Sequence, residues 1–263
     1  MKTRGMGHVE VILAFVLFVS AVVFILQFID IKNDTNAGEA TLAFVSRLIK
    51  TEAETSITRY SIILNKTELG KQGEPLTVTI LLPEAIPEGY GLRAEAVVAG
   101  QPLKLASKKH ETDKSKVIVE RDKKETQVLR LIIGPEINVL EASNLGTPAN
   151  NPNLYTLSLL PETKIFAETK LQTMQESYMR DYQAFKKARG IGERTNLQFE
   201  VRWKNPEIIV PNPETQILEP KQDFIKAQRA IHSRVDVTAN TQRLELLLKD
   251  GQLVFADVTI QTW

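Results

Sequence analysis

The chain opens on a long apolar run. From Val11 to Ile29 about 19 residues follow without a charge, and Ser20 and Gln27 are the polar positions among them. At a rise of about 1.5 Å per residue, a helix of this length matches the hydrocarbon core of a bilayer. A secretory signal peptide has a shorter apolar region and a small-residue cleavage site, which is missing before Asp30. The pattern therefore predicts a retained transmembrane helix over residues 6–29.

Charges at the two ends of this run predict its orientation. Lys2 and Arg4 precede it, whereas Asp30, Lys32 and Asp34 follow it without a positive excess. Because positive residues favour the cytoplasmic side, we expect a cytoplasmic N-terminus and an extracytoplasmic C-terminal domain. The protein is then a single-pass membrane protein in contact with membrane lipid.

Periodicity changes after the apolar run. Residues 30–38 are polar and without period, which predicts a linker, and apolar residues between 40 and 54 recur at helical spacing. Alternation with a period of two then predicts short strands, bounded by proline-rich and glycine-rich turns. These strands lie within residues 55–65, 75–83, 92–98, 116–120, 127–133 and 154–159. Such spacing is typical of an antiparallel sandwich, so we expect a β-sandwich-like domain over residues 39–160.

A different pattern begins near Pro161. Apolar residues three and four positions apart predict one long amphipathic helix over 163–189, with Gly190 at its C-cap. Strands are expected over 196–203 and 224–237, and Asp250-Gly251 between two apolar runs predicts a hairpin joining 244–248 to 253–260. Residues 161–263 therefore form a smaller α+β domain. The expected fold class is an N-terminal transmembrane helix followed by a β-rich ectodomain, with an antiparallel β-sandwich and this α+β domain.

Charge and composition exclude several classes of function. The chain has 33 basic and 32 acidic residues, and they balance beyond the first 29 residues, so nucleic acid is not an expected partner. Cysteine is absent, which excludes disulfides and thiolate chemistry. The three histidines, His8, His110 and His232, lack metal-ligand spacing, and no G-x-S-x-G nucleophile motif occurs. We expect no catalytic residues, no metal and no cofactor, and hence a non-enzymatic protein.

The first ten residues have a specific order. A basic stretch from Lys2 to Arg4 precedes Gly5, then Met6-Gly7-His8-Val9-Glu10 leads into the apolar helix. This order resembles the leader of type IV prepilins, over about the first 29 residues. The resemblance implies a leader at residues 1–5, cleavage after Gly5 by a prepilin peptidase, and Met6 as the new N-terminus. Glu10 is then the fifth residue of the mature chain.

Two interpretations of Glu10 stay open. In one, its carboxylate lies at headgroup level and has no specific role. In the other, which follows from the resemblance, the carboxylate neutralises the free amine of a neighbouring copy's Met6 and fixes the axial register of a filament.

Two functions from different classes follow. The first is a pilin-like or pseudopilin-like cell-envelope subunit that assembles with other copies or related subunits through its N-terminal helix. The alternative is a signal-anchored surface module that keeps Met1 and binds a protein or glycan partner without forming filaments. A membrane-tethered hydrolase is a third interpretation, and it would require a pocket with carboxylates of perturbed pKa that no sequence spacing reveals. Asn33 and Asn65 each begin an Asn-x-Thr triplet and are candidate N-glycosylation sites.

Overall fold

The structure is a computed structural model of the chain. It describes residues 6–73, 75–98, 101–121, 127–138, 142–143, 145–211, 218–231 and 235–263. Within these ranges only the backbone is described for residues 6–14, 23–37, 98, 101, 205–211 and 218–220.

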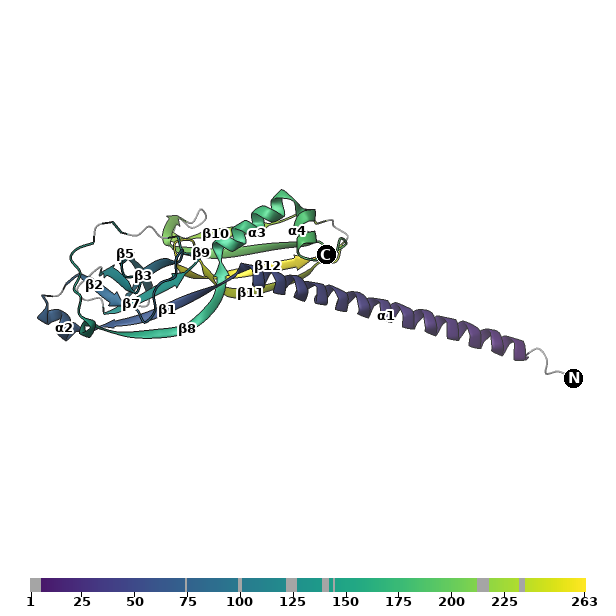
Figure 1. The fold of residues 1–263 in the computed structure, drawn as a ribbon. Coiled ribbons are helices and arrows are strands. Elements are labelled where there is room, and N and C mark those ends of the chain that lie inside the picture. The colour runs from purple at the N-terminus through teal and green to yellow at the C-terminus, as the bar shows by residue number, and fades with distance from the viewer. Residues whose placement is uncertain are drawn as a thin grey trace.

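Helix α1 (Met6–Ala53) is a single helix of 48 residues that projects from a β-rich body (Figure 1). The predicted linker over residues 30–38 and the separate helix after it are therefore wrong. The polar residues of this stretch have weak helix propensity, at a cost below about 1 kcal/mol each, and no proline interrupts them. Because α1 is helical on both sides of this polar stretch, the helix continues through it.

The predicted transmembrane helix over residues 6–29 is also wrong. No helix of the residues that the structure describes is long and apolar enough to cross a membrane. The prediction treated the apolar run as a helix of its own, whereas it is one part of a 48-residue helix that continues through polar sequence onto the body. The single-pass membrane localisation, with a cytoplasmic N-terminus and an extracytoplasmic C-terminal domain, depended on this helix and is corrected with it.

Most of the body is one antiparallel-rich sheet that has nine strands in the described part of the chain. In spatial order they are β10 (Leu218–Ala227), β9 (Leu197–Pro211), β12 (Leu253–Thr262), β11 (Thr238–Leu247), β8 (Tyr155–Ala167), β1 (Glu54–Leu64), β7 (Val128–Gly134), β3 (Gly91–Val98) and β4 (Gln101–Leu105). A second sheet has the order β2 (Thr77–Leu81), β6 (Lys116–Glu120) and β5 (Ser107–Lys109).

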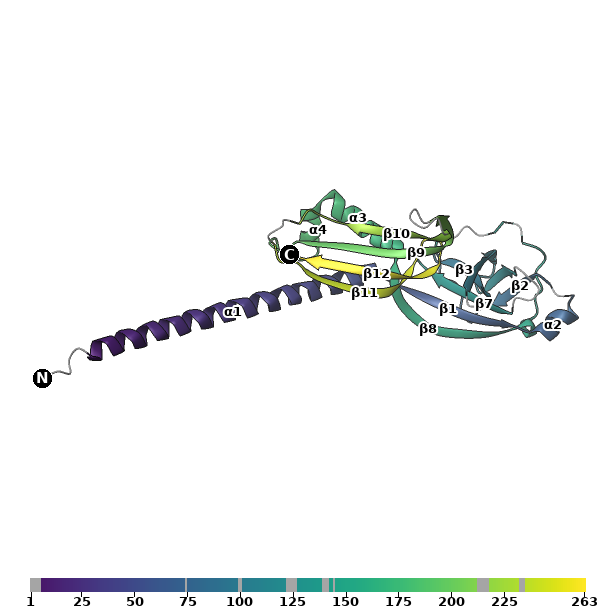
Figure 2. The same cartoon turned by 180° about the vertical axis from the view of Figure 1, so that it is seen from behind.

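The sheet has two halves, each with its own core. The proximal half, β10-β9-β12-β11, packs against α1, α3 (Glu168–Arg180) and α4 (Tyr182–Ala188). The distal half, β8-β1-β7-β3-β4, packs against the three-stranded sheet, with α2 (Lys66–Lys71) and the short 3-10 helix η1 (Pro152–Leu154) at its end (Figures 1 and 2). The expected fold class, a sandwich with a separate α+β domain behind a membrane helix, is thus replaced by one long sheet covered in two places.

Local predictions have mixed outcomes. The hairpin predicted at Asp250-Gly251 is confirmed, and Gly251 has a φ of 82°.

The single helix predicted over 163–189 is wrong, because β8 continues to Ala167 and the helix breaks at Asp181. This aspartate has extended backbone and its side chain accepts a hydrogen bond of 2.9 Å from the N–H of Ala184, so it starts α4 as an N-cap. The strand expected over 224–237 is also wrong, because β10 ends at Ala227 and β11 begins at Thr238.

The two halves of the sheet meet at a narrow joint. β8 and β11 pair at only two positions, Phe166 with Leu246 and Ala167 with Leu247. Beside them a small separate cluster of buried residues fills the space between the halves, with Leu253 packed against it. Its members are Ile57, Ile132, Ile137, Ile165 and Leu247. Two backbone pairs are few for a sheet junction, so side chains have to fix the angle between the halves.

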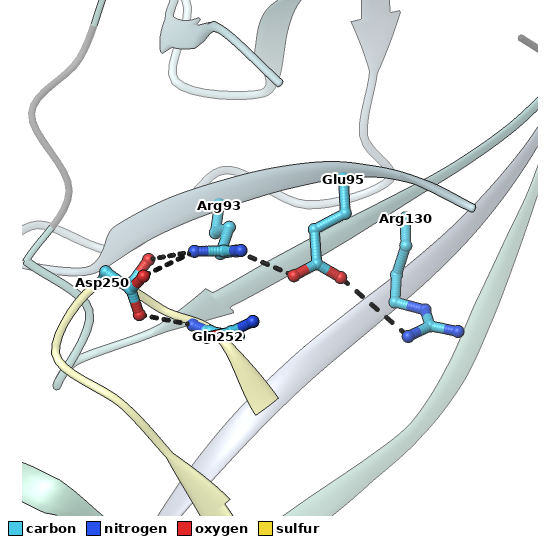
Figure 3. A network of polar contacts seen from close by, with 5 residues as sticks. All are labelled: Arg93, Glu95, Arg130, Asp250 and Gln252. Atoms are coloured by element: carbon cyan, nitrogen blue, oxygen red, sulfur yellow. Dashed lines mark hydrogen bonds and ion pairs between the residues drawn. The ribbon is translucent and has the colours of Figure 1, made fainter. Parts of the chain in front are cut away.

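A buried ion-pair network supplies this fixation (Figure 3). The Nε of Arg93, on β3, donates to Glu95 at 2.8 Å, and its Nη1 donates to the side chain of Asp250 at 2.9 Å and to its carbonyl at 3.2 Å. Arg93 and Glu95 are 0% and 1% exposed. Asp250 lies in the β11–β12 hairpin turn, so this guanidinium joins the distal half to the proximal half.

The hairpin turn can approach β3 this closely only because residue 251 is a glycine. A Cβ on Gly251 would lie 2.9 Å from the Cβ of Arg93.

We expect Arg93→Met to lower the free energy of unfolding by about 3–5 kcal/mol, because Glu95 stays buried without its closest cation. Urea denaturation followed by circular dichroism measures this loss. Lys114→Met is the control, since its 4.0 Å pair with Glu88 is exposed and should matter little. The double variant Arg93→Met with Glu95→Leu should recover part of the loss. An Arg93→Met variant as stable as Lys114→Met would contradict the role of the network.

Candidate functional site

The projecting part of α1 carries an unusual surface. Six large apolar side chains in the projecting segment, defined as residues 15–22, are between 37% and 67% exposed. They are Phe15, Val16, Leu17, Phe18, Val19 and Val22. Five of the six are consecutive. Exposed apolar residues are normally scattered over a protein surface, and a contiguous set indicates an interaction site.

The apolar surface goes all the way round the helix. Successive residues of an α-helix are rotated by about 100°, so positions 15–19 cover every side. A helix that is apolar on all sides is one that is buried on all sides. Ser20 fits this pattern, because its hydroxyl donates to the carbonyl of Val16 at 2.7 Å and needs no outside partner. Several neighbours, rather than one, are needed to cover the segment.

The other part of α1 is fixed to the body by an apolar stripe. Leu42, Val45, Ile49 and Ala53, at spacings of three and four residues, are buried against α3 and the proximal sheet. Helix α1 also passes β11 closely, since a Cβ on Gly38 would lie 3.1 Å from the hydroxyl of Thr238. The body therefore determines the direction in which the projecting segment points.

Polar contacts at the end of α1 reinforce this attachment. The guanidinium of Arg189 pairs with Glu52 at 2.7 Å and lies 3.8 Å from the centre of the Phe185 ring. The Nζ of Lys170, on α3, donates to the carbonyl of Glu54 at 2.6 Å. Both α3 and α4 thus hold the junction between α1 and β1.

Buried aromatic residues hold α3 and α4 in place. The ring of Tyr178 meets those of Tyr182 and Phe185 edge to face, with centres 4.9 and 5.4 Å apart. Burial raises the pKa of both tyrosines, so they stay neutral, and the Tyr178 hydroxyl donates to the carbonyl of Leu197 at 2.7 Å. Burial also lowers the pKa of Lys186, whose Nζ donates to the carbonyl of Glu193 at 2.6 Å. The group is structural, and it positions Arg189 against α1.

The residues of the prepilin-like leader are only partly described. Gly5 lies outside the described residues. Met6 begins α1 and Glu10 is one turn further along, but the side chains of both lie outside the described residues. Pairing between a Glu10 carboxylate and a Met6 amine therefore stays a prediction.

The two candidate glycosylation sites lie far apart. Asn33 is inside α1, and its side chain is outside the described residues. Asn65 is exposed and caps α2, at the opposite end of the molecule (Figure 1). Its side-chain oxygen accepts hydrogen bonds from the N–H groups of Thr67 and Glu68 at 3.1 and 3.4 Å. Modification of either asparagine stays a prediction.

Sequence reasoning missed a concave site in the distal half. Tyr60 on β1, Glu84 in the loop after β2 and Glu162 on β8 line one cavity. They come from three separate segments, so no spacing along the chain joins them. In the described part of the chain, this cavity included, no three histidine, aspartate or glutamate side chains lie close enough together to hold a metal ion.

Comparison with known proteins gives no relative from which a role could be carried over. No protein-family model, no curated protein and no solved structure matches this chain.

We expect Ile49→Ala to lower the free energy of unfolding by about 2–5 kcal/mol, because it opens a cavity under the stripe of α1. Phe44→Ala is the matched control on the same helix, since Phe44 is 49% exposed and Ile49 is 0% exposed. Hydrogen exchange should also quicken over residues 40–53 in Ile49→Ala alone. Equal effects of the two substitutions would contradict the anchoring role of the stripe.

Proposed function

We propose that this protein is a non-enzymatic, pilin-like assembly subunit whose copies associate through the projecting segment of α1. The observation that carries the proposal is the set of consecutive exposed apolar residues on all sides of a helix that extends from the body. The product is an oligomer or filament with a core of packed helices.

Energetic magnitudes favour several neighbours over one. Burying a Phe, Leu or Val side chain contributes about 1.5–3 kcal/mol, so the six residues together offer on the order of 10 kcal/mol. A single neighbour covers about a third of a helix surface and gains only about 3–6 kcal/mol. Association itself costs about 4–15 kcal/mol in lost motion, so a simple pair would be marginal. A bundle in which each helix has several neighbours recovers the whole gain.

The shape of the molecule is compatible with such a bundle. The body lies at the C-terminal end of α1, and the N-terminal end of the helix projects away from it (Figures 1 and 2). Helices can therefore pack side by side while the bodies remain outside the core. A helix that packs on several neighbours uses a different face for each contact. Such contacts between different faces are head-to-tail, and they generate helical filaments when they do not close into a ring.

The leader resemblance supports the same proposal independently. Cleavage after Gly5 by a prepilin peptidase would leave Met6 with a free amine at the start of α1. A Glu10 carboxylate from a neighbouring copy would neutralise this amine in the helix core, where an unpaired charge costs several kcal/mol. One register along the core would then be favoured over the others.

A cysteine scan of the projecting segment tests the assembly directly, because the natural chain has no cysteine. Single cysteines replace Phe15, Val16, Leu17, Phe18 and Val19 in five separate variants of the full chain. With a short bismaleimide reagent, we expect cross-linking between copies at every position, since packed helices lie about 8–10 Å apart. Rates should exceed that of the control Phe44→Cys by roughly tenfold or more, because packing raises the effective thiol concentration.

Two results of the scan would contradict the proposal. Rates equal to the Phe44→Cys control at all five positions would indicate that copies do not associate through α1. Cross-linking confined to Phe15 and Val19, which share one face, would indicate a simple helix pair instead of a multi-helix core.

Processing is tested by the N-terminal mass of the protein purified from its native source. We expect a chain that begins at Met6, and we expect Glu10→Gln to weaken assembly in sedimentation velocity without changing the unfolding of the body. Glu39→Gln, an exposed site on the same helix, is the matched control. A chain that retains Met1, or a Glu10→Gln variant that assembles as well as Glu39→Gln, would contradict the leader-based part of the proposal.

A further inference from the structure

The distal half contains a cavity of about 440 Å³ that the proposed assembly does not use. Its floor is the face of β1 and β8, and its wall is the loop between β2 and β3. Tyr60 and Tyr90 supply aromatic surface, Pro87 and Leu159 supply apolar surface, and Glu84 and Glu162 supply carboxylates. The volume lies within the range of about 300–1,000 Å³ that is typical of small ligand sites.

The charge of this cavity has one sign. Its described lining residues include the two carboxylates and no lysine, arginine or histidine. Neither Glu84 nor Glu162 forms an ion pair with any residue that the structure describes. Both glutamates are exposed, whereas Tyr60 is buried and Tyr90 is half-buried. A cation entering the cavity would meet two negative charges that nothing in the described chain neutralises.

Tyr60 is a second and independent indication of a ligand. Its side chain lines the cavity while the residue is only 4% exposed, and its hydroxyl has no hydrogen-bond partner among the described residues. The hydroxyl oxygen itself is accessible to solvent, so it opens onto the cavity that the side chain lines and is available to a ligand. Burial, and then the charge of Glu84, raises the pKa of Tyr60, so the hydroxyl stays protonated and can donate.

The strand beside the cavity has a free edge. β8 pairs with β1 from Tyr155 to Phe166, apart from a register shift at residues 161–162. On its other side it pairs with β11 only at Phe166 and Ala167. Residues 155–165 therefore pair with no second strand in the described part of the chain, and this arc of β8 forms a margin of the body (Figures 1 and 2). Leu159 is 60% exposed on it, and Pro161 lacks an N–H, which edge strands tolerate. Unpaired edges of this kind accept extended peptides as an added strand.

We propose that this cavity binds the side chain of a lysine or arginine that is carried on an extended segment of a partner protein lying along the free edge of β8. The tyrosine rings accommodate the aliphatic stem and the cation, and the two carboxylates accept its hydrogen bonds. Backbone pairing with β8 aligns the segment. This site is independent of α1 and does not depend on the proposed assembly.

Peptide selection on the full-length protein tests the proposal. A displayed library of random 12-residue peptides is selected on the natural chain alone, so that the double variant Glu84→Gln with Glu162→Gln stays an independent test. We expect the selected peptides to share one lysine or arginine at a fixed place within an alternating apolar pattern. The best peptide is then synthesised in four forms. One keeps its basic residue, one has norleucine in its place, and two carry N-methyl groups on alternate backbone nitrogens in the two possible registers.

Binding of these peptides is measured by biolayer interferometry. The norleucine form, and the Glu84→Gln with Glu162→Gln variant, should each weaken binding by roughly tenfold or more, since each removes charge-assisted hydrogen bonds. Tyr60→Phe should weaken it by a smaller factor. The matched control is Glu88→Gln with Glu111→Gln, which removes two exposed charges from the same half outside the cavity and should leave binding unchanged.

Four outcomes would overturn the proposal or one part of it. Selected peptides without a shared basic residue would exclude a cationic side chain as the ligand. Equal binding to the Glu84→Gln with Glu162→Gln variant would place the contact elsewhere. Unchanged binding of both N-methylated registers would exclude pairing with the edge of β8. Selective binding of peptides from this chain's own sequence would replace the partner protein by a second copy.

Discussion

The fold depends on one contact between the two ends of the sequence. The first element, α1, packs Leu42, Val45, Ile49 and Ala53 against the proximal half of the sheet, which includes β11 and β12, the last two strands in the sequence. Without this apolar stripe the proximal core would be open to water, and the attached helix would lose its fixed direction. The same helix then leads directly into β1 of the distal half. One packing contact therefore orients the projecting segment, closes the proximal core and places the distal half.

The distal half is held by charge where backbone pairing is scarce. A sheet that continued through β8 and β11 with full pairing would need no further connection, but only two residue pairs link these strands. The guanidinium of Arg93 compensates by joining Glu95 on its own strand to the turn that carries Asp250 (Figure 3). Buried ion pairs add little net stability, although they define a geometry because the alternatives leave a charge unpaired. The angle between the halves is set in this way.

Two surfaces with opposite character follow from this architecture. The projecting segment of α1 is convex and apolar on every side, which suits it to a core made of several helices. The cavity beside β8 is concave and acidic, with Tyr60 at its wall and a strand edge next to it. They lie on different parts of the molecule, so a subunit held through α1 would still present the distal half outward. Assembly and recognition would then be performed by separate parts of one chain.

The sequence by itself determined what local periodicity encodes. Alternation located strands such as β2, β6 and β7, Asp250-Gly251 located the hairpin, and the run from Val11 to Ile29 located the apolar part of α1. It did not determine where helices end. Weak polar propensity is overridden when a helix continues on both sides, and the helical spacing of apolar residues continues from Tyr178 to Tyr182 across the Asp181 cap. Only the tertiary structure decided that one sheet runs through both halves, that Arg93 reaches Asp250, and that Tyr60, Glu84 and Glu162 share a cavity. These residues are far apart in sequence, and only the packing of the strands brings them together.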